Sequence, residues 1–509
     1  MNAIHGLLLL LGVFLVSRLF KKRPLRALPP GPKGLPLIGS VFDLPTTHMW
    51  LTFADWCKKW GDIMSVNILG QPFVILSSAQ YAIDILEKKS AIYSSRGRVP
   101  VAGDMVGWSE AMILQPYGQR MRDIRKLFGQ VLGNAKRVER FQQLVEDETQ
   151  QFLVRLSQRT DSLSLEIKKL AGTIIVMIAY GYKSSGDDDL IINTVDKSME
   201  DFGTIFAPGA FMADAFPFLR HIPDWFPGAG WKKAVAKHRE TFVAMVELPY
   251  MWVREQMAAG TARPSFASAL LEGNQDAEKE YLIKMTAASL YAGGADTTVV
   301  AITNFFLAMT CFPDIQLKAQ AEIDAVIGQD RLPSIADKDR LPYLHALMLE
   351  ILRWMPVAPM GFPHQLIEDD FHAGYFLPKG TLVLVNIWKI LHDPALYSDP
   401  MTFNPERFLA TPDKEAERDP RDFAFGFGRR KCPGIFFAEA SIFAAIAETL
   451  AIYNVSKATD ANGNIIEPRV EPSGAVISHP APFQGKITVR SNKARTLLDG
   501  LRNGAPESN

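Results

Sequence analysis

The chain has 509 residues, of which 48% are hydrophobic and 22% charged, and 55 basic residues balance 55 acidic ones. The neutral balance gives no sign of a nucleic-acid partner, and the apolar fraction suits a large globular core. Three cysteines exclude a disulfide framework. Length alone would suggest about three domains, but no repeat or linker follows residue 40, so we expect one large fold.

The N-terminus predicts a membrane anchor. Residues 4–16 are almost wholly apolar, and Lys21, Lys22, Arg23 and Arg26 follow. The apolar run is short for a span of about 20 residues, but snorkelling by Arg18 would lengthen it. A cleaved signal peptide is the alternative, yet the basic cluster follows the apolar run and no small-residue cleavage site is evident. We therefore expect a retained anchor over residues 1–23, with the body of the protein on the cytoplasmic side.

The next segments predict a connector and a small sheet. Residues 24–40 are rich in proline and glycine, which indicates a stiff, non-helical hinge. Strands are expected at 63–68 and 73–77, joined by a turn at 69–72, and a second hairpin at 373–377 and 381–385. Most of the remainder has helical periodicity, so the predicted fold class is mainly α with a small β-sheet region.

Two further stretches leave alternatives open. A basic helix begins near residue 117, and a solvated cationic face is one interpretation of its Arg120, Arg122 and Lys126. Between residues 202 and 231 the chain is aromatic, apolar and repeatedly broken by proline. Core packing is the default account of these aromatic side chains. The alternative is a second membrane contact that also serves as a lid over a ligand channel.

A long helix, apolar on nearly all sides, is predicted from 281 to 309, as in a buried central helix. Its paired glycines, Gly293 and Gly294, cost about 1 kcal/mol each relative to alanine. Close packing on a neighbouring helix would explain them, and so would a new helix capped by Asp296 after an end at Gly294. A functional account is that the helix passes over a flat ligand while Asp296 and Thr297 bind a small molecule. A transmembrane helix is excluded by the unpaired Asp296 carboxylate.

Glu350 and Arg353 lie at i,i+3 on one predicted helix, a spacing that pairs their charges. An exposed pair of this kind is worth less than about 1 kcal/mol, so the signal is weak alone. After this helix, the prolines of residues 356–363 require an extended chain that leads to His364.

Residues 425–434 read Phe-Gly-Phe-Gly-Arg-Arg-Lys-Cys-Pro-Gly, and an apolar helix follows. Cys432 would lie at that helix's N-terminus, where unpaired N–H groups lower a thiol's pKa and favour the metal-binding thiolate. One thiolate argues against zinc and iron–sulfur clusters, whereas a haem iron needs a single protein ligand. The alternative is a buried, inert cysteine, which is our interpretation of Cys57 and Cys311.

The pattern Phe-x-x-Gly-x-Arg-x-Cys-x-Gly resembles the haem-binding loop of the cytochrome P450 monooxygenases. Three further segments resemble motifs of that family in the same order: residues 293–298, the Glu350/Arg353 pair, and residues 403–408 with Arg407. The resemblance covers residues 29 to about 491 and is closest to membrane-bound, class II microsomal members from filamentous fungi. It implies a P450-type haem-thiolate domain over 41–491, behind the anchor and hinge, with a polar tail at 492–509.

The resemblance also implies roles for individual residues. Haem b would be the cofactor, with Cys432 as the axial ligand of its iron and Phe425 opening the binding loop. Asp296 and Thr297 would handle protons during oxygen activation. The propionates would be held by Arg125, His364 and Arg430, although Met121 stands where the family's propionate-binding tryptophan is expected. A buried ionic network would consist of Glu350, Arg353 and Arg407.

The implied reaction inserts one oxygen atom of dioxygen into a hydrophobic small molecule. Electrons would come from NADPH through a partner NADPH–cytochrome P450 reductase, with cytochrome b5 as a further donor, because the chain has no flavin or nicotinamide motif. The cations of the basic helix could join Arg429 and Lys431 in the docking patch. The expected location is the endoplasmic reticulum membrane. Family habit suggests a terpenoid or polyketide of secondary metabolism, in a pocket lined by Val106, Met112, Phe206, Phe211, Leu290, Ala358 and Val476.

Two other functions stay open on the sequence. The same scaffold could rearrange a peroxide or desaturate its substrate, although rearrangement would not need the Asp296–Thr297 relay. A non-catalytic haem sensor or carrier is the second alternative, and NADPH oxidation in the presence of reductase would distinguish it.

Overall fold

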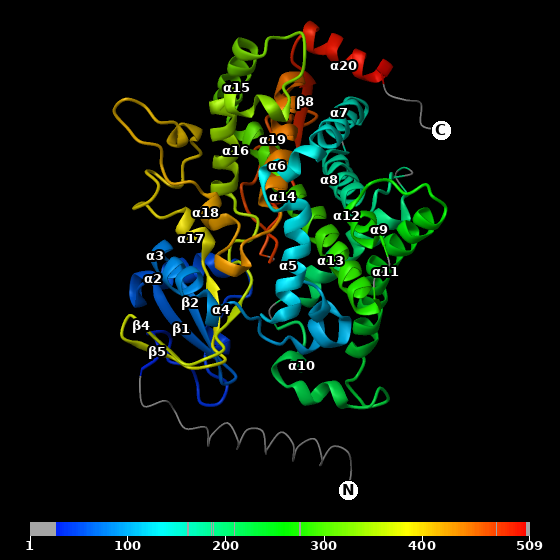
Figure 1. Ribbon diagram of the computed structural model, residues 1–509. Helices are drawn as coiled ribbons and strands as arrows, with labels where there is room; N and C mark the ends of the chain where they lie inside the picture. The colour runs from blue at the N-terminus through cyan, green and yellow to red at the C-terminus, as the bar shows by residue number, and fades with distance from the viewer. Residues whose placement is uncertain are drawn as a thin grey trace. The chain divides into compact units, whose positions relative to one another are not determined.

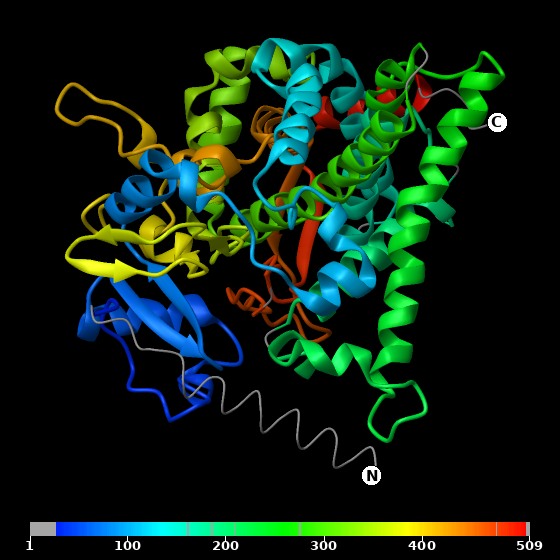
Figure 2. The ribbon, with the colours of Figure 1, turned by 60° about the horizontal axis from the view of Figure 1, so that its bottom comes forward.

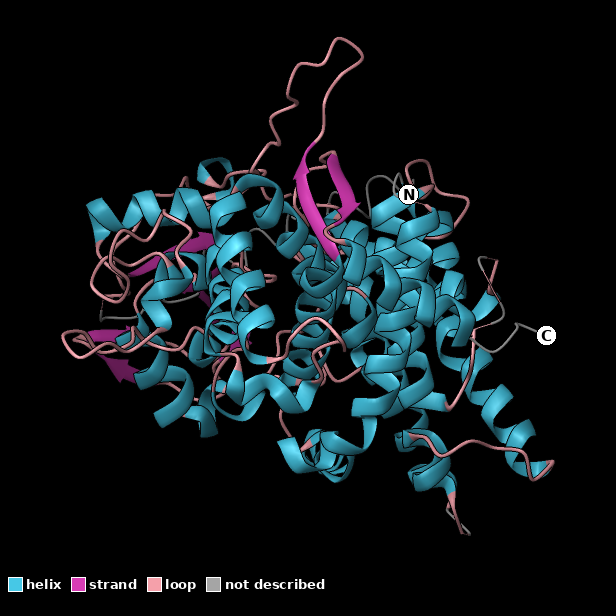
Figure 3. Ribbon diagram, turned by 90° about the horizontal axis from the view of Figure 1, so that it is seen from above, coloured by secondary structure: helices cyan, strands magenta, loops and turns pink. Residues whose placement is uncertain are grey.

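The structure, a computed structural model, describes residues 27–504 apart from 160–161, 185, 187, 208, 274–275 and 475. It is mainly helical, with 57% helix and 9% strand, as the sequence predicts. Figure 3 shows how small a part of the ribbon is strand. The anchor predicted over residues 1–23 lies outside the described residues.

The chain divides into two compact units, and neither is continuous in sequence. The smaller unit holds residues up to Gly97, Met360–Ile390 and Phe427–Arg430. The larger unit holds Arg98–Pro359, Leu391–Gly426 and the chain from Lys431 onward. The division therefore passes through the cysteine loop itself, between Arg430 and Lys431.

A four-stranded sheet in order β1-β2-β6-β3 forms the centre of the smaller unit. β1 (Ile63–Ile68) and β2 (Gln71–Leu76) are antiparallel and joined by a tight turn, as predicted. β6 (Leu382–Val385) runs parallel to β2, and β3 (His364–Gln365) pairs with its other edge. The helices and short turns of this unit are η1 (Val41–Asp43), α2 (Met49–Trp60), α3 (Ala79–Ala82), η2 (Ile83–Lys88), α4 (Ser90–Tyr93) and η10 (Gly428–Arg430). α17 (Ile387–Leu391) ends at the boundary of the unit.

The second predicted hairpin is wrong. β5 (Tyr375–Leu377) does not pair with β6 but with β4 (Asp370–His372), and these two strands form a separate sheet. The reason is the two-residue turn between β4 and β5, where Ala373 and Gly374 have φ of 49° and 82°. Positive φ at both turn residues matches the twist of a hairpin. The turn at 378–380 instead joins strands of different sheets.

The proline-rich hinge is non-helical from residue 27 onward, as predicted, and it lies along β1. Ser65 donates through its N–H to the Pro30 carbonyl at 2.8 Å and through its hydroxyl to the Pro29 carbonyl at 2.6 Å. A Cβ at Gly31 would lie 1.8 Å from the Ser65 oxygen, so only glycine permits this approach. The start of the hinge is thus bound to the sheet.

Buried apolar helices form the core of the larger unit. α13 (Ala277–Ala295) and α14 (Thr297–Cys311) follow each other with only Asp296 between them, where the sequence predicts one long helix. They pack with α8 (Leu163–Tyr180), and α19 (Ile435–Ile452) packs with α7 (Gln142–Gln158) and α14. The α13–α14 segment and α19 are long and apolar enough to cross a membrane, but 72% and 83% of their most apolar windows are buried. Both are core helices here.

Figure 1 labels these helices, and Figure 2 shows the segment around α10 leading into the long, continuous α11. The remaining elements of this unit are η3 (Pro100–Val106), η4 (Trp108–Glu110), α5 (Gln119–Leu132), α6 (Ala135–Val138), η5 (Glu139–Phe141), α9 (Leu190–Ile205), α10 (Met212–Ala215), η7 (Pro217–His221), α11 (Trp231–Ala258), α12 (Phe266–Leu271), α15 (Pro313–Val326), η8 (Ile335–Arg340), α16 (Pro342–Trp354), η9 (Pro405–Phe408), α18 (Arg421–Ala424), and the paired strands β7 (Tyr453–Lys457) and β8 (Gly485–Val489).

The polar tail predicted from residue 492 is a helix as far as 504. α20 (Asn492–Gly504) buries Ala494 and Leu498 and contacts α7, α19 and β8. Its apolar positions lie four residues apart, so one face is buried although the composition is polar.

Candidate functional site

The cysteine loop is closed by its own backbone. The Cys432 N–H donates to the Phe425 carbonyl at 2.8 Å, which brings the two ends of the loop together. Gly426 and Gly428 have φ of 77° and 51°, a region that glycine adopts without strain. A Cβ at Gly428 would lie 2.2 Å from the Leu86 carbonyl oxygen. This glycine is therefore required by a neighbouring backbone and not only by a flat ligand.

Cys432 lies just before α19, whose N-cap residue is Gly434. Burial raises the pKa of the Cys432 thiol, while the Gly434 N–H and the Arg125 guanidinium act in the opposite direction. The predicted fall in pKa is thus wrong in sign for the protein alone, because desolvation outweighs the helix N-terminus. Two groups that favour the thiolate are nevertheless beside the sulfur.

Arg125 reaches the cysteine loop from α5. Its guanidinium donates to the Lys431 carbonyl, one residue before Cys432. Burial lowers the pKa of Arg125, and the charge of Cys432 partly offsets this. Met121, one turn earlier, is buried, and its thioether has no N–H to donate.

Two cationic side chains, Arg430 and Arg96, and one histidine gather in the smaller unit. Arg430 donates to the Ser94 carbonyl at 2.7 Å, and Arg96 donates to the Phe362 and Pro363 carbonyls at 2.7 and 2.8 Å. Burial, and then the charge of Arg430, hold the pKa of Arg96 well below its usual value. Two guanidinium groups at such close range suit an anionic ligand.

His364 belongs to the same group and is buried in β3. Its Nδ1 lies 2.9 Å from the Tyr93 carbonyl oxygen, which can only accept, so Nδ1 carries the proton. Burial and the charge of Arg96 hold the pKa of His364 well below its usual value. A neutral His364 therefore presents Nε2 as an acceptor, and it must take up a second proton before it can bind a carboxylate.

These donors fit a haem. One cysteine sulfur with a backbone N–H and a guanidinium nearby suits a metal that takes a single thiolate from the protein. The buried arginines suit carboxylates such as propionates. Among the described residues, no group of three His, Cys, Asp or Glu side chains could hold a metal ion together.

Asp296 and Thr297 lie at the break between α13 and α14. Asp296 occupies the N-cap position of α14, but its side chain caps no backbone N–H. The Thr297 hydroxyl donates to the Gly293 carbonyl at 2.7 Å. The break frees the Asp296 carboxylate and turns the Thr297 hydroxyl back on the preceding turn.

The paired glycines serve different purposes. A Cβ at Gly294 would lie 2.6 Å from the Cδ1 of Ile175 on α8, whereas one at Gly293 would meet nothing within 4 Å. Gly294 thus allows close packing of α13 on α8, which was one of the predicted accounts. Gly293 leaves open space beside the helix.

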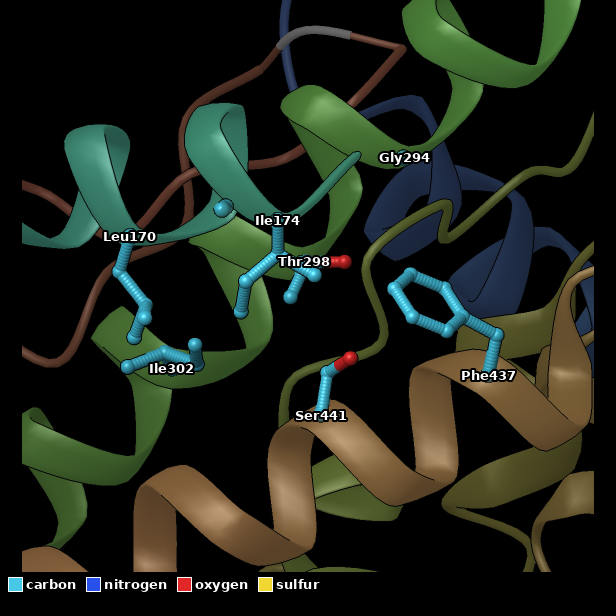
Figure 4. Close-up of a pocket in the computed structure, with 8 residues that line it drawn as sticks. Leu170, Ile174, Gly294, Thr298, Ile302, Phe437 and Ser441 are labelled. Atoms are coloured by element: carbon cyan, nitrogen blue, oxygen red, sulfur yellow. The ribbon is translucent and has the colours of Figure 1, made fainter. Parts of the chain in front are cut away.

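A cavity of about 10 Å³ lies between α8, α14 and α19. Figure 4 shows Thr298 and Ser441 pointing toward it, with Ile174 and Phe437 beside them. The Ser441 hydroxyl is buried and has no hydrogen-bond partner among the described residues. A space of this size admits at most one water molecule, so it is no substrate pocket.

His479 contacts Asp296, a pairing the sequence does not predict. Its Nε2 lies 2.9 Å from Oδ1 of Asp296, and the His479 and Asp296 side chains are 37% and 20% exposed. The two residues are far apart in the chain and neither spacing nor periodicity relates them. Arg96 escaped notice for the same reason, because a single arginine between Ser95 and Gly97 carries no signal.

The structure brings Glu350, Arg353 and Arg407 together, with side chains 0%, 0% and 2% exposed. Arg353 binds Glu350 through two hydrogen bonds of 2.7 and 2.8 Å, and Arg407 Nε lies 3.2 Å from Glu350 Oε2. The network continues to Glu417, whose Oε2 accepts from Arg407 at 2.8 Å. The fourth member was not predicted, because it lies in an irregular loop.

The cations of α5 do not form one solvated face. Arg120 lies 2.6 Å from Glu110 and over the ring of Tyr281, so it belongs to a local structural cluster. Arg122 and Lys126 are exposed. In the smaller unit Arg429 is exposed as well.

The aromatic stretch from 202 to 231 divides between the two predicted accounts. Phe202 is buried and packs on Trp108 with ring centroids 4.8 Å apart. Further along, Met212 and Trp225 are 62% and 75% exposed. The start of the stretch is core, and the part around α10 presents apolar side chains to solvent.

Comparison with known proteins identifies similar chains. Residues 29–487 match the sequence model of the family described as cytochrome P450. The chain is 52% identical over 474 residues to cytochrome P450 monooxygenase 208 of Postia placenta, covering 93% of this chain and 92% of that protein. It is 43% identical to cytochrome P450 monooxygenase claR of Ampulloclitocybe clavipes (96% and 90% covered) and 38% identical to cytochrome P450 monooxygenase ppsD of Aspergillus oryzae (97% and 95% covered).

Proposed function

The chain belongs to the cytochrome P450 family and is a monooxygenase, and on that premise we propose that it oxidises a hydrophobic small molecule, chiefly by hydroxylation. The family implies a haem-thiolate cofactor. The observation that carries the proposal is the position of Cys432, with the Gly434 N–H and Arg125 beside its sulfur. When bound, the haem supplies an iron whose thiolate ligand favours cleavage of the O–O bond.

Cys432 is the proposed axial ligand. The Gly434 N–H and the Arg125 guanidinium stabilise negative charge on its sulfur, which offsets only part of the desolvation that raises the thiol's pKa. Phe425 holds the other end of the loop through its carbonyl. Together these contacts hold the backbone of the loop and favour negative charge on the sulfur.

The propionates are proposed to bind Arg125, Arg430 and His364, and Arg96 joins them as a candidate. Arginine suits a carboxylate through its planar, paired donors. His364 contributes a donor only when protonated, because Nδ1 is committed to the Tyr93 carbonyl. A propionate beside it would favour that protonated form.

Asp296 and Thr297 are the proposed proton-handling pair. Reduction of dioxygen consumes protons, and a carboxylate with a neighbouring hydroxyl can pass them through hydrogen bonds. The broken helix leaves the Asp296 carboxylate uncommitted to α14 and the Thr297 hydroxyl bonded to Gly293.

NADPH is the proposed electron source, through a partner NADPH–cytochrome P450 reductase, with cytochrome b5 as a further donor. Exposed cations support docking of an acidic partner. Arg122 and Lys126 supply them in the larger unit and Arg429 in the smaller one.

We propose attachment to the endoplasmic reticulum membrane through residues 1–23. The exposed Met212 and Trp225 support a second contact, because apolar side chains of this size are costly in water and favourable at a lipid interface. A fungal secondary metabolite is the proposed substrate class, in a pocket whose candidates include the buried Val106 and Leu290.

Co-expression with a fungal reductase tests the proposal. Lipophilic compounds are screened for a low-to-high spin shift of the haem, and each hit is incubated with NADPH and labelled dioxygen. We expect a product that carries one labelled oxygen atom. NADPH oxidation without an oxygenated product from any spin-shifting compound would contradict the proposal and favour a sensor or carrier.

A further inference from the structure

We propose that His479 is a positioning residue for proton supply, which holds the Asp296 carboxylate and passes it protons from solvent. The inference rests on the proposed function, because it deepens the part assigned to Asp296. No motif of the chain assigns a role to His479. The contact between the two side chains does.

The backbone around His479 is held in place by its own loop. Nε2 of His479 lies 2.9 Å from Oδ1 of Asp296. The His479 carbonyl accepts from the Ser473 N–H at 2.6 Å, and Pro472 and Pro480 form a β-bridge on either side of the loop. The Ala481 N–H donates to the Glu471 carbonyl at 2.7 Å, one residue further out. The backbone that carries His479 is therefore held at successive positions of the loop.

Asp296 is available for this contact because it does no capping. At the N-cap of α14 a carboxylate ordinarily accepts from a backbone N–H of the first turn, yet here no such bond forms. The exposed fraction falls from 37% for the His479 side chain to 20% for the Asp296 side chain. His479 is therefore the more solvent-accessible member of the pair, beside the break in the helix.

Imidazole suits such a transfer because it has two nitrogens and titrates near neutral pH. A solvent proton binds to Nδ1 while the proton on Nε2 moves to the Asp296 carboxylate. The imidazole then returns to its starting tautomer by exchange with water. Each cycle moves one proton inward and leaves the charge of His479 unchanged, so no further reactant is needed.

Other charged groups surround the pair, and one of them is a rival. Asp196 on α9 has its pKa raised to about 6 by burial, and the charges of Asp296 and Glu200 raise it while Lys168 on α8 lowers it. Asp196 therefore changes its charge in the same pH range as a histidine. A test of His479 must separate the two groups.

The test uses the full-length holoenzyme with reductase and NADPH and without substrate, so that no ligand need be known. Dioxygen then takes up either two electrons and two protons to give hydrogen peroxide, or four of each to give water. His479→Gln keeps an N–H donor for Asp296 but cannot relay a proton. We expect it to slow water formation about tenfold, less than the loss from removing the proton donor itself (roughly 10²–10⁴-fold). We also expect a higher peroxide share and a weaker pH dependence than in the wild type.

Two variants serve as controls. His238→Gln makes the same change in a second His–Asp pair, where His238 Nδ1 lies 3.1 Å from Asp201 Oδ2, and should match the wild type. Asp196→Asn should keep the wild-type pH dependence. The proposal is overturned if His479→Gln behaves as the wild type, or if the pH dependence disappears in Asp196→Asn and persists in His479→Gln.

Hydrogen exchange of the resting holoenzyme tests the contact without turnover. Asp296→Asn and His479→Gln should both speed amide exchange in residues 476–481, and His238→Gln should not. Unchanged exchange in both variants would mean that the contact is absent, which also overturns the proposal. If the wild type forms neither water nor peroxide with reductase and NADPH, the proposed function fails, and the exchange result still decides the contact.

Discussion

Glu350, Arg353 and Arg407 show how burial decides the weight of a short sequence signal. All three charges are almost fully buried, and Arg353 also donates to the Leu391 and Pro400 carbonyls. Removing one member strands its partner charge at a cost of about 3–5 kcal/mol. We expect Glu350→Ala or Arg353→Ala to give protein that lacks haem, measured as haem per polypeptide after purification.

Arg418→Ala is the matched control for this prediction. Arg418 forms a pair with Asp422 at 3.2 Å, but both side chains are more than 40% exposed. An exposed pair is worth at most about 1 kcal/mol, so haem content should stay normal. Normal haem content in Glu350→Ala as well would refute the structural role of the network.

The buried carboxyl group of Glu448 should make the stability of the protein depend on pH. The side chain is buried in α19, and both carboxylate oxygens have no hydrogen-bond partner among the described residues. Burial, and then the charges of Glu146 and Asp147, raise the pKa of Glu448 well above its usual value. The unfolded chain loses this proton at a lower pH than the folded protein does. The free energy of unfolding therefore falls as pH rises from about 4.5. The slope is about 1.4 kcal/mol per pH unit until the folded pKa is reached.

Glu448→Gln should remove that slope, so its gain in stability over the wild type grows with pH in urea unfolding. Glu439→Gln on the same helix is the opposite control. Burial raises the pKa of Glu439, but its pairs with Lys338 and Arg421 outweigh burial and lower it. That variant should lose stability at neutral pH and approach the wild type in acid. Equal pH slopes for Glu448→Gln and the wild type would contradict the account.

Functional residues could be predicted where they occur together in a short sequence motif. They could not be predicted where they come together only in the folded structure. Cys432, Asp296, Thr297 and the Glu350–Arg353 pair lie in short motifs. No motif relates His479 or Arg96 to its partners, which each residue meets across long stretches of chain. The sign of the Cys432 pKa could not be read from a helix N-terminus, because desolvation depends on what packs around the sulfur.

At the scale of elements, the two glycines near the end of α13 allow a prediction about stability. Gly294→Ala would place a Cβ 2.6 Å from Ile175, and overpacking of this kind costs about 1–3 kcal/mol. Gly293→Ala meets nothing within 4 Å and should gain up to about 1 kcal/mol of helix propensity. We expect Gly294→Ala to unfold at a lower temperature than the wild type and Gly293→Ala to unfold at the same or a higher one. The reverse order would contradict the packing of α13 on α8.

The positions of strands could be predicted from the local sequence, but the pairing between strands could not. β1 and β2 follow from alternating apolar residues around a tight turn. The error at β5 and β6 came from assuming that neighbouring strands pair, whereas the positive-φ turn at Ala373 and Gly374 directs β5 to β4. α20 was missed because two buried residues in a polar segment give little signal.

At the scale of the molecule, three of the four family motifs lie in the larger unit, and the fourth, the cysteine loop, is shared between the two units. The chain crosses between the units several times, and the cysteine loop itself is divided between Arg430 and Lys431. Such a division cannot be found from linkers or composition, because no linker marks it. The sequence could therefore predict the fold class and the family, but not how the chain is partitioned.

The most direct test of the account is the carbon monoxide difference spectrum of the reduced Cys432→Ala protein, with Cys57→Ala and Cys311→Ala as controls. The account predicts that both controls keep the absorption typical of a thiolate-ligated haem and that Cys432→Ala loses it. A thiolate spectrum from Cys432→Ala would contradict the assignment of the iron ligand, and with it the roles proposed for the residues around that sulfur.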